Sequence, residues 1–191
     1  FGISHFGLYY LYSSIKVKGT THLASGLAGS VYFAPAIVDY AGSIGVSAPY
    51  SSLLIVCGML IGSLLPDIDT PKSKIGRKVP VTSHLLGFFI GHRTLFHSLA
   101  VPVFLSILTF WVKRMGSVSL FPVLFLVGSV TLGYILHIIL DSFTKEGVPL
   151  LYPFSDHCFG FKLVREGGVI DYLLGFVLFV LAALEILKYI S

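Results

Sequence analysis

Long apolar runs separated by short polar segments dominate this sequence. The runs approach the ~20 apolar residues that a membrane-spanning helix needs. They comprise residues 22–40, 50–65, 98–112, 119–140 and 169–189. The first run is rich in Gly and Ala, which allow membrane helices to approach one another closely. The pattern predicts an all-α, polytopic helical membrane protein with about five membrane-embedded helices.

Composition agrees with this class. Of the 191 residues, 55% are hydrophobic and 12% are charged, and the mean hydropathy is +0.89. Soluble domains usually contain only ~45–50% apolar residues. We therefore expect a single membrane-embedded, hydrolase-like domain over residues 20–191. Residues 1–19 are expected to be an interfacial segment or the remnant of a longer precursor.

Charge and cysteine content narrow the choice of partners. The net charge is only +4 and the basic residues are spread over several loops, so no nucleic-acid partner is predicted. Cys57 and Cys158 do not form a CxxC pair, which argues against both a disulfide framework and a cysteine-rich zinc site. The sequence does not predict an oligomeric state.

The distribution of Lys and Arg predicts how the chain crosses the membrane. Basic residues cluster in residues 66–97 and 141–168, whereas residues 41–49 contain none. Cytoplasmic loops carry an excess of Lys and Arg. The sequence thus predicts a multi-pass protein of a bacterial or archaeal cytoplasmic (inner) membrane, with its Asp and His residues at the cytoplasmic face.

Three polar strings beside the apolar runs carry the candidate chemistry. They are residues 65–69, 92–98 and 137–141, and each contains two side chains that can ligate a metal. Ionisable residues next to membrane segments are costly and usually functional, so we expect one assembled site. The candidate metal ligands are His22, Asp67, Asp69, His92, His97, His137 and Asp141.

The spacing of these residues supports a metal site without requiring one. His137 and Asp141 are four residues apart and so share a helix face. Imidazole with carboxylate suits Zn, Mn or Fe, although a His–Asp hydrogen bond at a helix end explains the pair equally well. Asp67 and Asp69 follow Pro66, where carboxylates also serve as ordinary turn and capping residues.

A phosphate-containing substrate is suggested by polar residues near these strings. Arg93 lies between His92 and His97 and could hold a phosphate oxygen in a bidentate manner. Ordinary loop solvation accounts for each of the remaining candidates taken alone. The candidate substrate-binding residues are Ser73, Lys74, Thr144 and Lys145. Neither a GxSxG elbow nor a Walker loop is present, so a serine hydrolase or P-loop NTPase is not predicted.

The order of these motifs resembles the YdjM-type family of LexA-regulated inner-membrane proteins, which are described as metal-dependent hydrolases. The resemblance covers about residues 20–155 and includes a stretch from Gly147 to Pro153. It is carried by Thr21-His22-Leu23-Ala24, Leu65-Pro66-Asp67-Ile68-Asp69, Gly91-His92-Arg93, Phe96-His97-Ser98, His137 and Asp141. A more distant similarity, to zinc-dependent phospholipase C, rests on an N-terminal His, a PD element and an HxxxD helix. The chain departs from that family by lacking its N-terminal Trp ligand.

These features together predict a membrane-bound metal-dependent hydrolase, acting on a phosphoester of a lipid or lipid-linked substrate at the cytoplasmic surface. One to three divalent ions are expected, zinc first and manganese or iron as alternatives. Metal binding lowers the pKa of water to ~7. The candidate catalytic residues are Asp69 as general base, Arg93 for phosphoryl charge, and His97.

Two other functions are compatible with the same residues. The first is a non-enzymatic metal- or lipid-binding membrane protein, such as a transporter or an envelope-stress regulator. Transport would favour charges along a path near the bilayer midplane. Here the polar residues are expected mainly at one membrane surface, and Asp39 is the exception. The second is hydrolysis of an amide or ester at the same metal site.

Overall fold

The computed structural model describes residues 19–70, 73, 75–90, 95–115, 121–165 and 167–190, and within them it is helical with no β-strand. The predicted all-α fold is confirmed. The helices are α2 (Thr20–Ser43), α3 (Ala48–Leu64), η1 (Leu65–Asp69), α4 (Pro80–Ile90), η2 (Leu95–His97), α5 (Ala100–Arg114), α6 (Phe121–Ser142) and α7 (Val169–Ile190). The segment expected at residues 1–19 lies outside the described residues except for Gly19.

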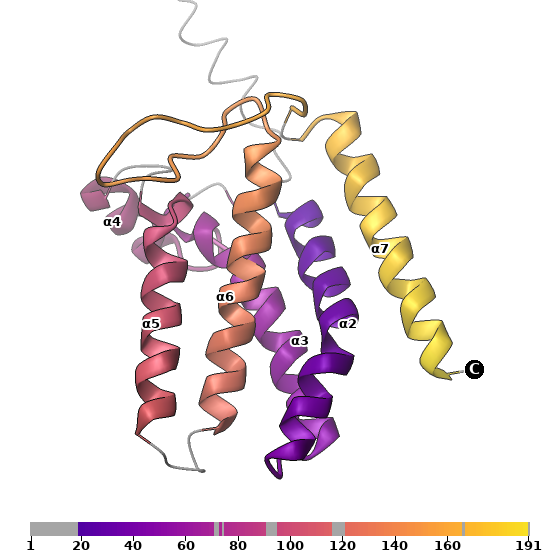
Figure 1. Ribbon diagram of the computed structural model, residues 1–191. Helices are drawn as coiled ribbons and strands as arrows, with labels where there is room; N and C mark the ends of the chain where they lie inside the picture. Colours follow the sequence, from indigo (N-terminus) through magenta and orange to yellow (C-terminus); the bar gives the residue numbers. More distant parts are fainter. Residues whose placement is uncertain are drawn as a thin grey trace, which may run out of the picture.

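The five predicted apolar runs correspond to α2, α3, α5, α6 and α7 (Figure 1). Within the described residues, three segments are long and apolar enough to cross a membrane: Ala48–Asp69, Phe121–Ser142 and Val169–Lys188. Helix α5 has only 15 residues, and α2 contains many small and weakly polar residues. Three candidate spans are therefore established, and spanning by α2 and α5 stays a prediction.

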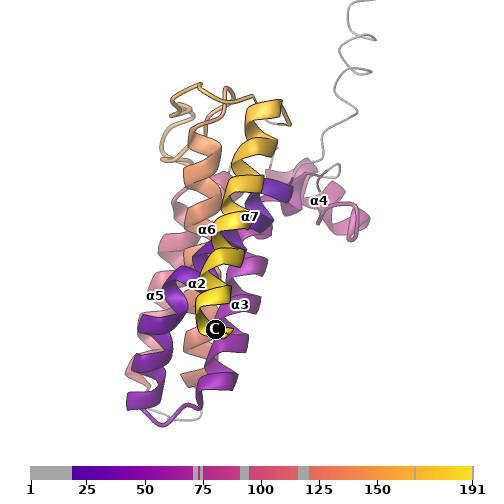
Figure 2. The ribbon, with the colours of Figure 1, turned by 90° about the vertical axis from the view of Figure 1, so that its right-hand side faces the viewer.

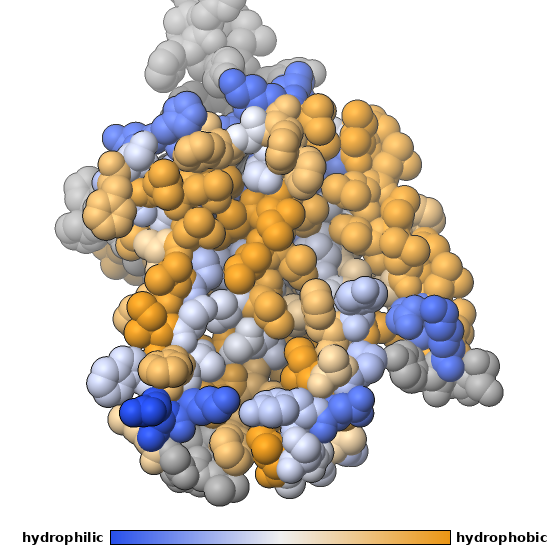
Figure 3. All heavy atoms as spheres, viewed as in Figure 1, coloured by the Kyte–Doolittle hydropathy of each residue, from blue (hydrophilic) through white to orange (hydrophobic). Residues whose placement is uncertain are grey.

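Helices α2, α3, α5 and α6 run alongside one another, and α7 leans away from the bundle (Figure 1). Helix α4 projects to one side of the bundle (Figure 2) and contacts η1. Apolar side chains cover α7 and much of the adjoining bundle, while hydrophilic side chains gather at the upper and lower edges (Figure 3). This distribution is the one expected for helices embedded in a bilayer.

Glycines bring the backbones of α3 and α6 into close contact. A Cβ added to Gly62 would lie 2.1 Å from the carbonyl oxygen of Val130, and one added to Gly133 would lie 2.3 Å from that of Met59. Gly26 gives α2 a similar approach to α3, since its Cβ would lie 2.6 Å from Ser63 Oγ. Small residues at such contacts let membrane helices gain dispersion energy from close packing.

The loop after α6 is fixed over the same end of the bundle. Val148 and Phe159 exchange two backbone hydrogen bonds, and Val148 packs into a buried cluster with Tyr134 and Ile138 of α6. The Tyr134 hydroxyl donates to the Phe96 carbonyl, which ties η2 to α6. Through this hydrogen bond, the apolar cluster around Tyr134 holds η2, and with it His97, against α6.

We predict that Gly133→Ala destabilises the protein, because its new methyl group would press on the Met59 carbonyl. Overpacking of this kind typically costs about 1–3 kcal/mol. Thermal unfolding in detergent would show a lowered midpoint. Gly128→Ala on the same helix is the matched control, since its Cβ would meet nothing within 4 Å. Equal midpoints for the two variants would contradict the proposed role of the α3–α6 contact.

Candidate metal centre

Three imidazoles and two carboxylates converge at one end of the bundle. His22 lies in the first turn of α2, and Asp67 comes from η1 at the end of α3. His97 closes η2, while His137 and Asp141 lie in the last two turns of α6. Their exposed fractions range from 0 to 7%. Residues far apart in sequence thus form one buried polar cluster.

Asp141 lies at the centre of the cluster. Its Oδ1 is 3.3 Å from His22 Nε2, and its Oδ2 is 3.5 Å from Nε2 of both His97 and His137. Asp67 Oδ1 is 3.8 Å from His97 Nε2. The rings of His22 and His137 stack with centroids 3.8 Å apart. Every residue of the cluster is thus close to at least one other.

The orientation of His137 is set by a backbone contact. Its Nδ1 lies 2.7 Å from the carbonyl oxygen of Ser63. Because a carbonyl can only accept, Nδ1 carries the proton, and in a neutral ring Nε2 then presents its lone pair toward Asp141. A histidine that ligates a metal typically donates its other N–H to a carbonyl or carboxylate in this way.

The unused hydrogen-bonding capacity of the histidines fits a metal. No hydrogen-bond partner among the described residues reaches His22 Nδ1, His137 Nε2 or either ring nitrogen of His97, although all four atoms are buried. Buried polar groups normally find partners. Two groups of residues could each hold an ion, because within each group the ligand atoms lie within 4.8 Å of one another. One group is His22, Asp67 and His137, and the other is His97, His137 and Asp141.

The nitrogen–oxygen distances point the same way. At 3.3–3.8 Å they exceed the ~2.7–3.2 Å of good N–H···O hydrogen bonds. Two ligands bound ~2.1 Å from a tetrahedral ion lie about 3.4 Å apart. The cluster therefore has the donor types, burial and spacing of a site that can hold a divalent ion, and its atoms do not identify which ion.

The structure groups only part of the predicted ligand set. His22, Asp67, His97, His137 and Asp141 come together as predicted. Asp69 is fully buried but belongs to neither group of ligand atoms, and its Oδ1 accepts a hydrogen bond from the Thr70 hydroxyl at 3.1 Å. His92, Arg93 and Lys74 lie outside the described residues.

The remaining candidate substrate residues occupy different environments. Ser73 is buried, donates to the Asp67 carbonyl at 2.8 Å and accepts from the Gly76 N–H. The Thr144 hydroxyl donates to the Asp141 carbonyl at 2.7 Å. Both hydroxyls thus bond to the backbone of residues in the His/Asp cluster. Lys145 is exposed, and its backbone N–H donates to Val164.

Sequence reasoning assigned no role to two groups that shape the site. The Ser63 carbonyl orients His137, and no side-chain pattern identifies a backbone acceptor that is 74 residues away. Tyr134 connects α6 to η2, and here a signal exists. It precedes His137 by three residues and so lies on nearly the same helix face.

The chain is similar to inner membrane proteins. A sequence profile described as YdjM inner membrane protein matches residues 17–188. YvsG, an uncharacterized protein of Bacillus subtilis (strain 168), is 32% identical over 137 residues, which cover 72% of this chain and 74% of YvsG. The inner membrane protein YdjM of Escherichia coli (strain K12) is 41% identical over 99 residues, 52% of this chain and 49% of that protein. No solved structure matches.

We predict that the purified protein contains about one or more equivalents of Zn, Mn or Fe, and that Asp141→Asn removes most of it. Asp141 approaches all three histidines, and altering even the partners of metal ligands lowers affinity by ~10–100-fold. Elemental mass spectrometry of detergent-purified protein measures this content. His157→Ala, at an exposed histidine outside the cluster, should retain the metal. A wild-type protein that stays metal-free after reloading would contradict the assignment.

Proposed function

Because this chain belongs to the YdjM family of inner membrane proteins, we propose that it is a membrane-bound metal-dependent hydrolase acting on a phosphoester of a lipid or lipid-linked substrate. The observation that carries the proposal is the buried group of histidine and aspartate atoms at ligand-like separations. The apolar surface of the surrounding helices supports a substrate drawn from the bilayer (Figure 3).

The metal would be held by the cluster of His22, Asp67, His97, His137 and Asp141. When bound, a divalent ion supplies a Lewis acid that polarises a phosphoryl oxygen and activates water. The chain fixes the ligands in advance. The Ser63 carbonyl orients His137, and the Thr144 hydroxyl secures the backbone at Asp141. Preorganised ligands of this kind lower the reorganisation that the reaction requires.

Asp69 is proposed as the general base. It lies two residues after Asp67 in the same short helix, is buried, and is not part of either group of ligand atoms among the described residues. A carboxylate that is not used in ligation can accept a proton from attacking water. The Thr70 hydroxyl donates to Asp69 Oδ1 at 3.1 Å, and the Asp69 carboxylate is the proposed proton acceptor.

Positive charge on the loops supports phosphate over a neutral ester or amide. Arg93 is proposed to hold the phosphoryl oxygens, and His97 lies four residues after it within the metal cluster. Lys145 is exposed on the loop that follows α6 and can reach a charged head group. Arg is suited to bidentate recognition of phosphate, and Lys acts as a point charge.

A metal-binding protein without catalytic activity is the second candidate. It is favoured by the nearly complete burial of all five cluster residues, which is also typical of closed structural sites. Zinc uptake into proteoliposomes, together with no hydrolysis of any phospholipid tested, would support this function over the hydrolase.

We predict that Asp69→Asn lowers phospholipid hydrolysis by ~100-fold or more while the metal content stays at the wild-type value. General acid–base groups typically contribute 10²–10⁴-fold to rate. The measurement is phosphate or head-group release from a panel of phospholipids, with metal analysis of each preparation. Asp141→Asn should lose both activity and metal.

The same variants separate the roles of the two carboxylates. Loss of metal in Asp69→Asn would show that Asp69 is a ligand rather than the base. Full activity in both variants would contradict the hydrolytic mechanism. Asp171→Asn is a suitable control, because the Asp171 carboxylate accepts the Gly167 N–H just before α7 and lies outside the cluster.

A further inference from the structure

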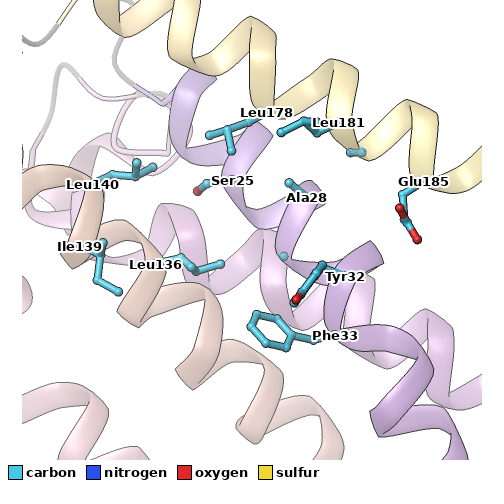
Figure 4. Close-up of a pocket in the computed structure, with 12 residues that line it drawn as sticks. Ser25, Ala28, Tyr32, Phe33, Leu136, Ile139, Leu140, Leu178, Leu181 and Glu185 are labelled. Carbon is cyan, nitrogen blue, oxygen red and sulfur yellow. The ribbon is translucent and has the colours of Figure 1, made fainter.

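An apolar groove lies between α2, α6 and α7 (Figure 4). Its volume is about 480 Å³, within the ~300–1,000 Å³ of typical small-molecule sites. Leu136, Leu178 and Leu181 contribute to its walls. Tyr32, Ile139 and Leu181 are exposed, so the groove is open toward the surroundings of the bundle.

One end of this groove adjoins the metal cluster. Ser25 lines the groove and lies one helical turn after His22, whose carbonyl accepts its hydroxyl hydrogen bond. On α6, Leu136 and Leu140 line the groove and directly precede His137 and Asp141. The groove and the cluster therefore share the same stretches of two helices.

The polarity of the groove changes along its length. Between Ser25 and Tyr32 it extends roughly 10 Å along α2, at ~1.5 Å per residue, and its walls there are apolar. The charged lining residue is Glu185 on α7, whose carboxylate pairs with Lys188 at 2.7 Å. Figure 4 shows Glu185 well separated from Ser25 and Leu140. The walls between Ser25 and Tyr32 therefore fit an apolar chain, and the end at Ser25 and Leu140 is the one next to the stretches that carry His22, His137 and Asp141.

We propose that this groove binds one acyl chain of a membrane phospholipid and places its phosphate-bearing head at the His/Asp cluster. The inference rests on the proposed hydrolase function and adds to it the position of the substrate tail. For a groove with apolar walls that opens toward a bilayer, the acyl tails of lipids are the apolar ligand at hand. A chain along Leu136 and Leu140 lies beside the face of α6 that carries the metal ligands.

A second groove of about 450 Å³ lies between α2, α3 and α7 and provides an internal comparison. It is also apolar, with Leu27, Leu60 and Phe176 among its lining residues. However, α6 contributes no residue to it, and it adjoins the cluster only through Thr21 and Leu23, which flank His22. The proposal therefore assigns the acyl chain to the groove that α6 borders.

The test uses the full chain in detergent micelles, with phosphatidic acid that carries a photoactivatable diazirine on one acyl chain. Cross-links are mapped by mass spectrometry, and the metal content of the same sample is measured. We expect saturable labelling at Leu136, Leu140 and Leu178. Unlabelled long-chain phosphatidic acid should compete, whereas the dibutyryl form, which has the head but short tails, should compete poorly.

Ala28→Trp fills the groove and should lower its labelling by about tenfold, equivalent to ~1.4 kcal/mol of binding. Ala36→Trp is the matched control, because Ala36 is exposed on the same helix and outside the grooves. Its labelling should match that of wild type. Both variants should keep the wild-type metal content if they fold normally.

Each outcome separates the groove from the hydrolase proposal. Three results would overturn the groove assignment: non-saturable labelling spread over α5, labelling concentrated at Phe176, or labelling unchanged by Ala28→Trp. In each case, metal retained by the protein would leave the proposed function standing. Equal competition by the dibutyryl lipid would also overturn the groove assignment. Groove labelling that follows the expected pattern in a metal-free wild-type protein would support lipid binding and count against the hydrolase.

Discussion

Burial of two carboxylates inside an apolar helical bundle is the constraint on which the candidate site depends. Asp67 and Asp141 are almost completely removed from solvent. An uncompensated buried charge costs several kcal/mol even after the protein relaxes. Protonating both His22 and His137 would place like charges in rings stacked 3.8 Å apart. Metal ligation requires neutral imidazoles, and three of them with two carboxylates would carry a net charge of −2, which one divalent cation would balance.

Close helix packing is what brings these groups together. Gly62 precedes Ser63, whose carbonyl orients His137, and Gly133 lies about one turn before His137. Both glycines sit where α3 and α6 approach most closely. A side chain at either position would move the Ser63 carbonyl away from the imidazole. The ligand geometry and the packing of the membrane helices therefore depend on the same backbone contact.

Much of this arrangement follows from local sequence rules, and the remainder depends on tertiary packing. The apolar runs predicted the positions of five helices, and the four-residue spacing of His137 and Asp141 predicted their common face. Whether His22 reaches that face could not be read from sequence, because it depends on how α2 crosses α6. Spacing also could not separate Asp67 from Asp69, since the turn geometry of η1 decides which carboxylate joins the ligand atoms.

The predicted roles of hydroxyl groups illustrate the same difficulty. Ser73 and Thr144 were natural candidates for phosphate contacts, yet in the fold both hydroxyls bond to backbone carbonyls of residues in the His/Asp cluster. A sequence does not show whether a loop hydroxyl is used within the chain. The cytoplasmic orientation likewise stays a prediction, because it rests on the distribution of Lys and Arg and not on the arrangement of the helices.

Helix α6 connects the two parts of the proposed site. His137 and Asp141 share one face, and Leu136 and Leu140 share the adjacent face, displaced by a single residue or about 100°. The first face enters the polar cluster and the second lines the apolar groove. A ligand with a charged head and an apolar tail can contact both faces at once, whereas a water-soluble phosphoester can contact only the first. The geometry of one helix therefore supports the proposal of an amphiphilic substrate.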